Sequence, residues 1–190
     1  MFLLRDDISE ITALLERGAV ICFPTDTVWA IGCNVFDEAA IQRISDLKGG
    51  RPDKGYVLLV SSIEMLKRYV PKLHPRIETL LSFHERPLSI VYDKNEGLPA
   101  SVKAPDGSVA IRVVQDEFCR QLIESLGRPM LGTVAARTDA PFPPTFGAVS
   151  SEILGGVDYV VKHRQDDKEP AEPSPIAKLD RHLELDFLRE

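Results

Sequence analysis

Two hydrophobic patterns alternate along the 190-residue chain. Short unbroken apolar runs are typical of strands buried on both faces, whereas apolar residues three or four positions apart are typical of helices with one buried side. The spaced pattern predicts helices over residues 7–18, 37–49, 61–69, 75–84 and 116–127. The unbroken runs predict strands over residues 19–23, 55–60, 88–92, 109–113, 130–134 and 157–161. Helices interleaved with short strands indicate one α/β domain over residues 1–190, built on a mixed sheet.

Residues at the ends of these segments support the predicted boundaries. Asp7 and Asp116 precede helical patterns and are suited to cap them, and Gly18 and Gly127 follow where a left-handed residue would end a helix. Two stretches fit neither pattern: residues 140–145 contain three prolines, and residues 163–173 are charged and proline-bearing. We expect both to be loops, and loops on a rigid sheet are common places for binding sites.

The composition is that of a globular protein, with 44 % hydrophobic and 27 % charged residues. No apolar run approaches the ~18 residues that a membrane span needs, and the N-terminus turns acidic at Asp6 and Asp7, unlike a secretory signal. We therefore expect a cytoplasmic protein that does not use a membrane. The net charge of −6 argues against non-specific nucleic-acid binding, so any polyanion must meet a local patch.

Several common chemical motifs are absent from the sequence. The three cysteines, Cys22, Cys33 and Cys119, include no Cys-x-x-Cys pair, which favours buried thiols over a disulfide framework or a zinc site. Neither a Rossmann glycine fingerprint nor a P-loop is present, so a nucleotide would have to bind by another device. The four histidines do not pair with cysteines or carboxylates at metal-ligand spacing, and no protein metal motif is predicted.

The first candidate site is Thr25-Asp26-Thr27, which directly follows a predicted buried strand. Ligands of open α/β sheets collect beyond the strand ends, and two hydroxyls beside a carboxylate can orient a small polar ligand such as an amino acid. The alternative is a turn in which these side chains satisfy nearby backbone amides. Spacing alone does not decide between the two.

Four basic residues, Arg43, Lys48, Arg51 and Lys54, surround the Gly49-Gly50 break after a predicted helix. Their head groups can converge on a di- or triphosphate, although Lys48 also suits the helix C-terminus without any ligand. Arg112 stands at the end of a predicted apolar strand. A buried guanidinium there needs a partner, which either a ligand carboxylate or an internal aspartate would provide.

Several segments then form a recognisable series. They are residues 18–33, 47–55, 110–113, 127–133, 156–159 and 173–176, and together they resemble the YrdC-like family of threonylcarbamoyl-AMP synthases. The match is collinear from about residue 8 to residue 180, and its segment Pro24-Thr25-Asp26-Thr27 is fairly specific. The resemblance implies a twisted open α/β fold, with helices on both sides of the sheet and a concave, positively charged cavity.

The resemblance also implies an activity. Enzymes of this family condense L-threonine, bicarbonate and ATP into threonylcarbamoyl-AMP and pyrophosphate, for N6-threonylcarbamoyladenosine at position 37 of tRNA. Thr25 and Thr27 would then lie by the amino acid, and Arg112 would line the same cavity. Phosphates with Mg²⁺ would meet Lys48 and its basic neighbours Arg51 and Lys54; Thr133 and Ser174 complete the implied binding residues. A separate transferase would accept the adenylate.

The sequence departs from the family pattern at three polar positions. Gly50 stands where the Lys-x-Arg signature has its arginine, with Arg51 displaced by one, and Val134 and Ala136 replace a signature serine and asparagine. Each lost hydrogen bond to a nucleotide would cost ~1–3 kcal/mol. A rival hypothesis is therefore a catalytically impaired paralogue that binds a nucleotide or double-stranded RNA through its basic cluster.

Overall fold

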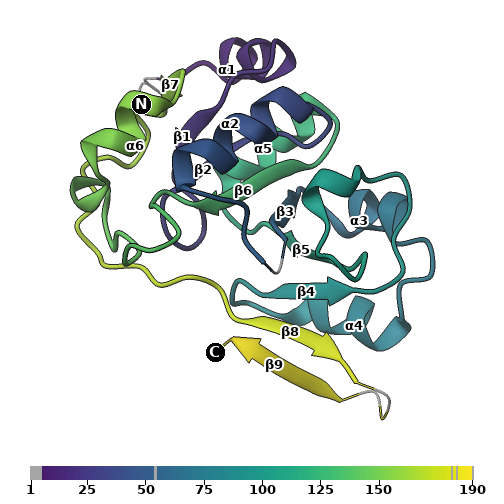
Figure 1. The fold of residues 1–190 in the computed structure, drawn as a ribbon. Helices are drawn as coiled ribbons and strands as arrows, with labels where there is room; N and C mark the ends of the chain where they lie inside the picture. The colour runs from purple at the N-terminus through teal and green to yellow at the C-terminus, as the bar shows by residue number, and fades with distance from the viewer. Residues whose placement is uncertain (1–5, 54, 181, 183, 190) are drawn as a thin grey trace.

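The nine strands of the described residues form one mixed sheet (Figure 1). The computed structural model describes residues 6–53, 55–180, 182 and 184–189. In chain order the strands are β1 Ile21–Phe23, β2 Ala30–Asn34, β3 Val57–Val60, β4 Ser89–Tyr92, β5 Val109–Val113, β6 Met130–Val134, β7 Tyr159–Val160, β8 Ile176–Leu179 and β9 Leu185–Arg189. Their spatial order is β7-β1-β2-β6-β3-β5-β4-β8-β9. The pairs β1–β7, β3–β5 and β4–β8 are parallel and the others antiparallel, so the predicted mixed sheet is confirmed.

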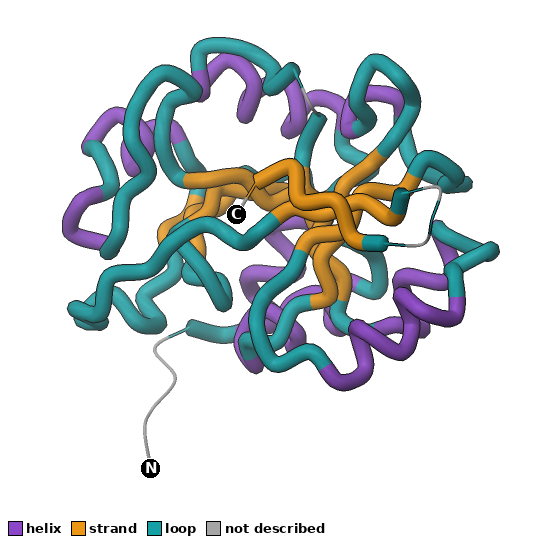
Figure 2. The backbone as a smooth tube through the Cα atoms, turned by 90° about the horizontal axis from the view of Figure 1, so that it is seen from below, coloured by secondary structure: helices purple, strands orange, loops and turns teal. Residues whose placement is uncertain are grey.

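Helices cover the sheet above and below the central band of strands in Figure 2. They are α1 Ile8–Glu16, α2 Glu38–Lys48, α3 Ile63–Tyr69, α4 Pro75–Phe83, α5 Glu117–Leu126 and α6 Ser151–Gly156, with short 3₁₀ turns at η1 Ala100–Val102 and η2 Phe146–Ala148. The side chains of Asp7 and Asp116 accept backbone N–H groups of the first turns of α1 and α5. Gly127 ends α5 in the left-handed conformation, as the sequence predicts.

The structure corrects the sequence-based prediction at four elements. Strands β2, β8 and β9 and helix α6 were not predicted. The strand signal of β2 is weak because its sequence, AIGCN, contains glycine and asparagine, both poor strand formers. It nevertheless lies between β1 and β6, where three residue pairs with β1 and five with β6 fix its register. The predicted loops 140–145 and 163–173 contain no helix or strand.

The core lies on both faces of the sheet and contains all three cysteines, which are free and buried. Burial raises the pKa of the Cys22 and Cys33 thiols to about 12, so neither is a thiolate near neutral pH. The prediction of buried thiols is confirmed. In the part of the chain that the structure describes, no helix is both long and apolar enough to cross a membrane.

Strands β2 and β6 approach each other closely at two glycines that face each other in the register, Gly32 and Gly132. A Cβ atom added to Gly32 would lie 2.1 Å from the carbonyl oxygen of Leu131 and 2.9 Å from the Phe23 ring. One added to Gly132 would lie 2.7 Å from a methyl group of Leu59. The middle of the sheet therefore packs only because these two positions carry no side chain.

Replacing Gly32 by alanine should destabilise the fold by about 2–4 kcal/mol, because the clash is with backbone and cannot be relieved by a rotamer change. Urea denaturation measures the change in the free energy of unfolding. The control is Gly155→Ala in α6, where an added Cβ meets nothing within 4 Å and alanine favours the helix. Equal stability of the two variants would contradict the close approach of β2 and β6.

Candidate active site

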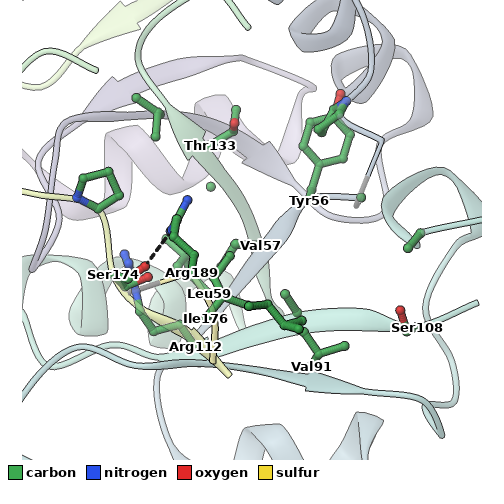
Figure 3. Close-up of a pocket in the computed structure, with 18 of the residues that line it drawn as sticks. Tyr56, Val57, Leu59, Val91, Ser108, Arg112, Thr133, Ser174, Ile176 and Arg189 are labelled. Atoms are coloured by element: carbon green, nitrogen blue, oxygen red, sulfur yellow. Dashed lines mark hydrogen bonds between the residues drawn. The ribbon is translucent and has the colours of Figure 1, made fainter. Parts of the chain in front are cut away.

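A cavity of about 780 Å³ opens on one face of the sheet, between the segment after β1 and the hairpin of β8 and β9 (Figure 3). Its wall includes five of the eight predicted binding residues: Thr25, Thr27, Arg112, Thr133 and Ser174. They come from the loop after β1, from β5 and β6, and from the loop before β8. The fold therefore brings together side chains that are up to 149 positions apart in the sequence.

The two threonines and Arg112 form one hydrogen-bond network. Arg112 Nη1 donates to Thr27 Oγ1 at 3.0 Å, and the Oγ1 atoms of Thr25 and Thr27 are also 3.0 Å apart. Thr25 Oγ1 donates to the Val28 carbonyl at 2.8 Å and accepts the Thr27 N–H at 3.0 Å. The turn interpretation and the ligand interpretation of this segment are therefore compatible: local bonds fix the hydroxyls on the cavity wall.

Arg112 has an internal partner. Its Nη2 lies 3.0 Å from Asp26 Oδ1, and both side chains are 7 % exposed. The second carboxylate oxygen of Asp26 accepts the Gln115 N–H at 3.0 Å. Among the described residues the Arg112 Nε atom has no hydrogen-bond partner, although it is buried. Asp26 thus balances the charge of Arg112 while one of the guanidinium donors stays unused.

A second guanidinium, from Arg189 at the end of β9, stands in the same cavity wall. Its Nε and Nη2 donate to the Ser174 carbonyl at 3.0 and 2.6 Å, while the Ser174 hydroxyl lies 2.9 Å from the hydroxyl of Ser89. Figure 3 shows the tip of Arg189 directed toward Thr133. Desolvation, and secondarily the charge of Arg112, lower the pKa of Arg189 from its ordinary value. Two cations therefore face one small volume.

Arg189 was missed because no strand was predicted near the C-terminus. The alternation of Leu185, Asp186 and Phe187 is a period-two signal that could have revealed β9. The same hairpin adds Leu188 and, from β8, Ile176 and Lys178 to the cavity wall. Tyr56, Asp53, Asp106 and Ser108 complete its polar lining from the segments before β3 and β5.

Lys48 is not among the described residues that line this cavity; it lies beside the cavity. The side chain is buried, and its Nζ donates to the carbonyl oxygens of Val134, at 2.8 Å, and Ala136. The Lys48 carbonyl in turn accepts the Thr138 N–H at 3.0 Å, so the end of α2 and the segment after β6 are bonded at both atoms. Burial lowers the pKa of Lys48 to about 8.

The other predicted phosphate ligands are placed as follows. Arg51 donates through Nη2 to the carbonyl oxygens of Ala100, at 2.9 Å, and Lys103, which directs it to η1. Lys54 lies outside the described residues. Val134, at a signature serine position, contributes an apolar side chain to the cavity wall. The roles of Lys48, Arg51 and Lys54 toward phosphate stay predictions.

The molecule is an α/β protein with an open cavity on one face of a mixed sheet, and the hydroxyls and guanidinium groups of that cavity are suited to a small polar anion or an amino acid. A model of the Sua5/YciO/YrdC family, described as telomere recombination, matches residues 13–190. The chain belongs to this family.

Curated relatives carry one shared description. A threonylcarbamoyl-AMP synthase of Pyrococcus abyssi is 28 % identical over 148 residues, covering 77 % of this chain and 44 % of that protein. A threonylcarbamoyl-AMP synthase of Chromohalobacter salexigens is 30 % identical over 138 residues, covering 72 % of this chain and 74 % of the relative. The chain thus spans less than half of the Pyrococcus protein and about three quarters of the other.

Solved structures agree with the predicted fold. Pyrococcus abyssi Sua5 complexed with L-threonine matches with a TM-score of 0.78 at 26 % identity, over 90 % of this chain and 50 % of that chain. Escherichia coli YciO matches with a TM-score of 0.80 at 21 % identity, over 96 % and 88 % of the two chains. At that lower identity the likeness shows the fold alone, and it extends over nearly the whole chain.

The buried amine of Lys48 should make stability depend on pH. The pKa of Lys48 is about 8 in the folded chain and ~10.4 in the unfolded chain, so the unfolded chain binds more protons between these two pH values. In that range the contribution of Lys48 to the free energy of unfolding therefore rises with pH. Lys48→Met removes this titration. From about pH 7 to 10.5 the wild type should gain up to about 3 kcal/mol relative to the variant in urea denaturation. Parallel pH profiles of the two proteins would contradict a neutralisable Lys48.

Proposed function

We propose that this protein is a threonylcarbamoyl-AMP synthase, formed by one YrdC-like domain over residues 1–190 and working in the cytoplasm. It would condense L-threonine, bicarbonate and ATP into threonylcarbamoyl-AMP and pyrophosphate, supplying the adenylate for tRNA modification. Family membership and the shared description of the curated relatives support this activity. So does the neighbouring structure of Sua5, which was solved with L-threonine.

One observation carries the proposal: a single cavity gathers Thr25, Thr27 and Arg112 with the second cation Arg189. L-Threonine offers a carboxylate, an ammonium and a hydroxyl. Guanidinium groups bind carboxylates through charge-assisted hydrogen bonds, and threonine hydroxyls can both donate and accept. The Arg189 tip gives an amino-acid carboxylate a charged donor in a partly desolvated wall, and the Thr25 and Thr27 side chains line the same cavity.

The reaction needs positioning more than a side-chain nucleophile. It forms a carbon–nitrogen bond between threonine and bicarbonate with loss of water, then a phosphorus–oxygen bond at the α-phosphate as pyrophosphate leaves. Both bonds form between substrates, so the cavity contributes by holding them together and by neutralising charge. Fixed hydroxyls and two guanidinium groups suit this task, because none of them has to move when charge develops.

ATP would bring Mg²⁺ with it as part of the substrate. No cluster of three histidine, cysteine, aspartate or glutamate residues that could hold an ion occurs among the described residues. Mg²⁺ at nucleotide sites is commonly held by one or two carboxylates, phosphate oxygens and water. Asp53 and Asp106 both line the cavity, and their carboxylates could contribute to such a complex.

The RNA-binding alternative rests on the basic cluster, and the geometry favours it less. Lys48 and Arg51 donate to main-chain carbonyls, which uses part of the donor capacity that phosphates of RNA would need.

The proposed synthase requires a separate transferase to accept the adenylate. We propose this transferase only as a class of enzyme and assign it no docking surface on the molecule.

The proposed activity predicts pyrophosphate release that depends on threonine. Purified protein with ATP, Mg²⁺ and bicarbonate should release pyrophosphate on addition of L-threonine and much less with L-valine, which has the same shape without the hydroxyl. A coupled phosphate assay after pyrophosphatase treatment measures the rate. Equal release with and without threonine, at enzyme concentrations where a curated relative turns over, would refute the synthase.

Thr27→Val should weaken L-threonine binding about tenfold, because the hydroxyl that accepts from Arg112 is lost while the shape is kept. Isothermal titration calorimetry gives the dissociation constant directly. The matched control is Thr79→Val on the exposed surface of α4, outside the cavity wall, which should bind as the wild type does. Equal dissociation constants for the two variants would remove Thr27 from the binding site.

A further inference from the structure

Arg164, in the loop between β7 and β8 (residues 163–173), forms a hydrogen bond to the segment Thr25-Asp26-Thr27. We call this loop the strap; in Figure 1 it is part of the yellow-green segment along one side of the molecule, and it leads to Ser174 on the cavity wall. Arg164 has a φ of +62°, and it is the only non-glycine residue with positive φ in the described chain. Such a conformation costs free energy in a residue with a side chain, so its persistence calls for a compensating interaction.

The Arg164 guanidinium supplies that interaction. Its Nη1 donates to the main-chain carbonyl of Thr25 at 3.0 Å and to Asp116 Oδ2 at 3.2 Å, and its Nη2 donates to Asp167 Oδ2 at 3.1 Å. Asp116 is the residue that caps α5 through its other carboxylate oxygen. One side chain of the strap therefore joins the first residue of the hydroxyl network to a fixed helix end.

The start of the strap is itself held firmly. The buried carboxylate of Asp6 accepts the N–H groups of Lys162 and His163 at 2.7–3.0 Å, and the His163 ring stacks on Phe118 at 5.2 Å between centroids. The backbone that carries Arg164 is thus anchored on both the N-terminal segment and α5. A guanidinium on a fixed base can hold the Thr25 carbonyl in a defined position.

We propose that Arg164 is a positioning residue, which orients the segment Thr25-Asp26-Thr27 for the amino-acid substrate by holding the Thr25 carbonyl against the strap. The role rests on the proposed function, because its consequence is the affinity for L-threonine. The Thr25 peptide precedes Asp26 and Thr27, so a rotation of that peptide would disturb the ion pair with Arg112 and the bond to Thr27 together. Arg164 thereby acts on the substrate without touching it.

A glycine substitution separates this role from a purely structural one. Arg164→Gly removes the guanidinium but places at φ +62° the one residue that adopts this conformation freely. A structural role predicts that stability and threonine affinity fall together. The positioning role predicts a melting temperature close to that of the wild type, with a threonine dissociation constant and KM raised about tenfold and an unchanged KM for ATP.

The experiment compares the wild type with Arg164→Gly, Arg164→Lys and Asp167→Asn. Lysine keeps one charged donor and should recover part of the affinity. Asp167→Asn loses an ion pair of Arg164 but keeps the oxygen that accepts the Glu169 N–H, so it should bind threonine as the wild type does. Calorimetry with L-threonine, thermal unfolding and pyrophosphate release are measured on each protein.

Amide hydrogen exchange at Thr27 gives a readout that needs no substrate, because its N–H donates to Thr25 Oγ1. Exchange should quicken in Arg164→Gly and stay unchanged in Asp167→Asn. Unchanged threonine affinity and unchanged Thr27 exchange in a folded Arg164→Gly protein would overturn the positioning role. If the wild type itself does not bind L-threonine, the proposed function fails, and the Thr27 exchange rate alone then decides whether Arg164 orders the segment.

Discussion

The buried ion pair of Arg112 and Asp26 is the interaction on which the candidate site depends. Strands β2, β6 and β3 separate β1 from β5, so in a flat sheet the ends of β1 and β5 would be about 19 Å apart. The pair forms because the segment after β1 leaves the sheet and runs across the strand ends to β5. Replacing either partner would leave an uncompensated charge in the cavity wall, which is far more costly than the net worth of the pair. Because Arg112 also donates to the Thr27 hydroxyl, the ion pair fixes one end of the hydroxyl network.

Local signals predicted most of the fold. Helices such as α2 and α5 were found because their capping aspartates and terminal glycines agree with the apolar spacing, and both act within a few residues. Strand β2 was missed because its small residues are dictated by the close approach to β6, at Gly32 opposite Gly132, and that constraint appears only once the strands are paired. Strand β9 was missed because its alternation of apolar and polar residues covers only Leu185, Asp186 and Phe187, and most of its side chains are exposed.

The candidate site was predicted in part for the same reason. Thr25, Asp26 and Thr27 are neighbours in the sequence, and their position after a buried strand pointed to a ligand. The partners of Lys48 could not be predicted, since spacing gives no account of main-chain carbonyls 86 and 88 residues away. Arg164 and Arg189 reach the site through long-range packing of a loop and an edge strand, and neither carries a local signal of its role.

Charge distribution in the cavity bears on how ATP would be accommodated under the proposed function. Asp26 balances the charge of Arg112 and Asp93 pairs with Lys178, so Arg189 is the cation of the cavity wall for which no carboxylate of the described residues lies within ion-pair distance. The Val134 side chain offers no donor, and the Lys48 ammonium already donates to two main-chain carbonyls, which leaves it one N–H for a phosphate. Under the proposed function, Mg²⁺ would therefore supply part of the neutralisation that the triphosphate needs.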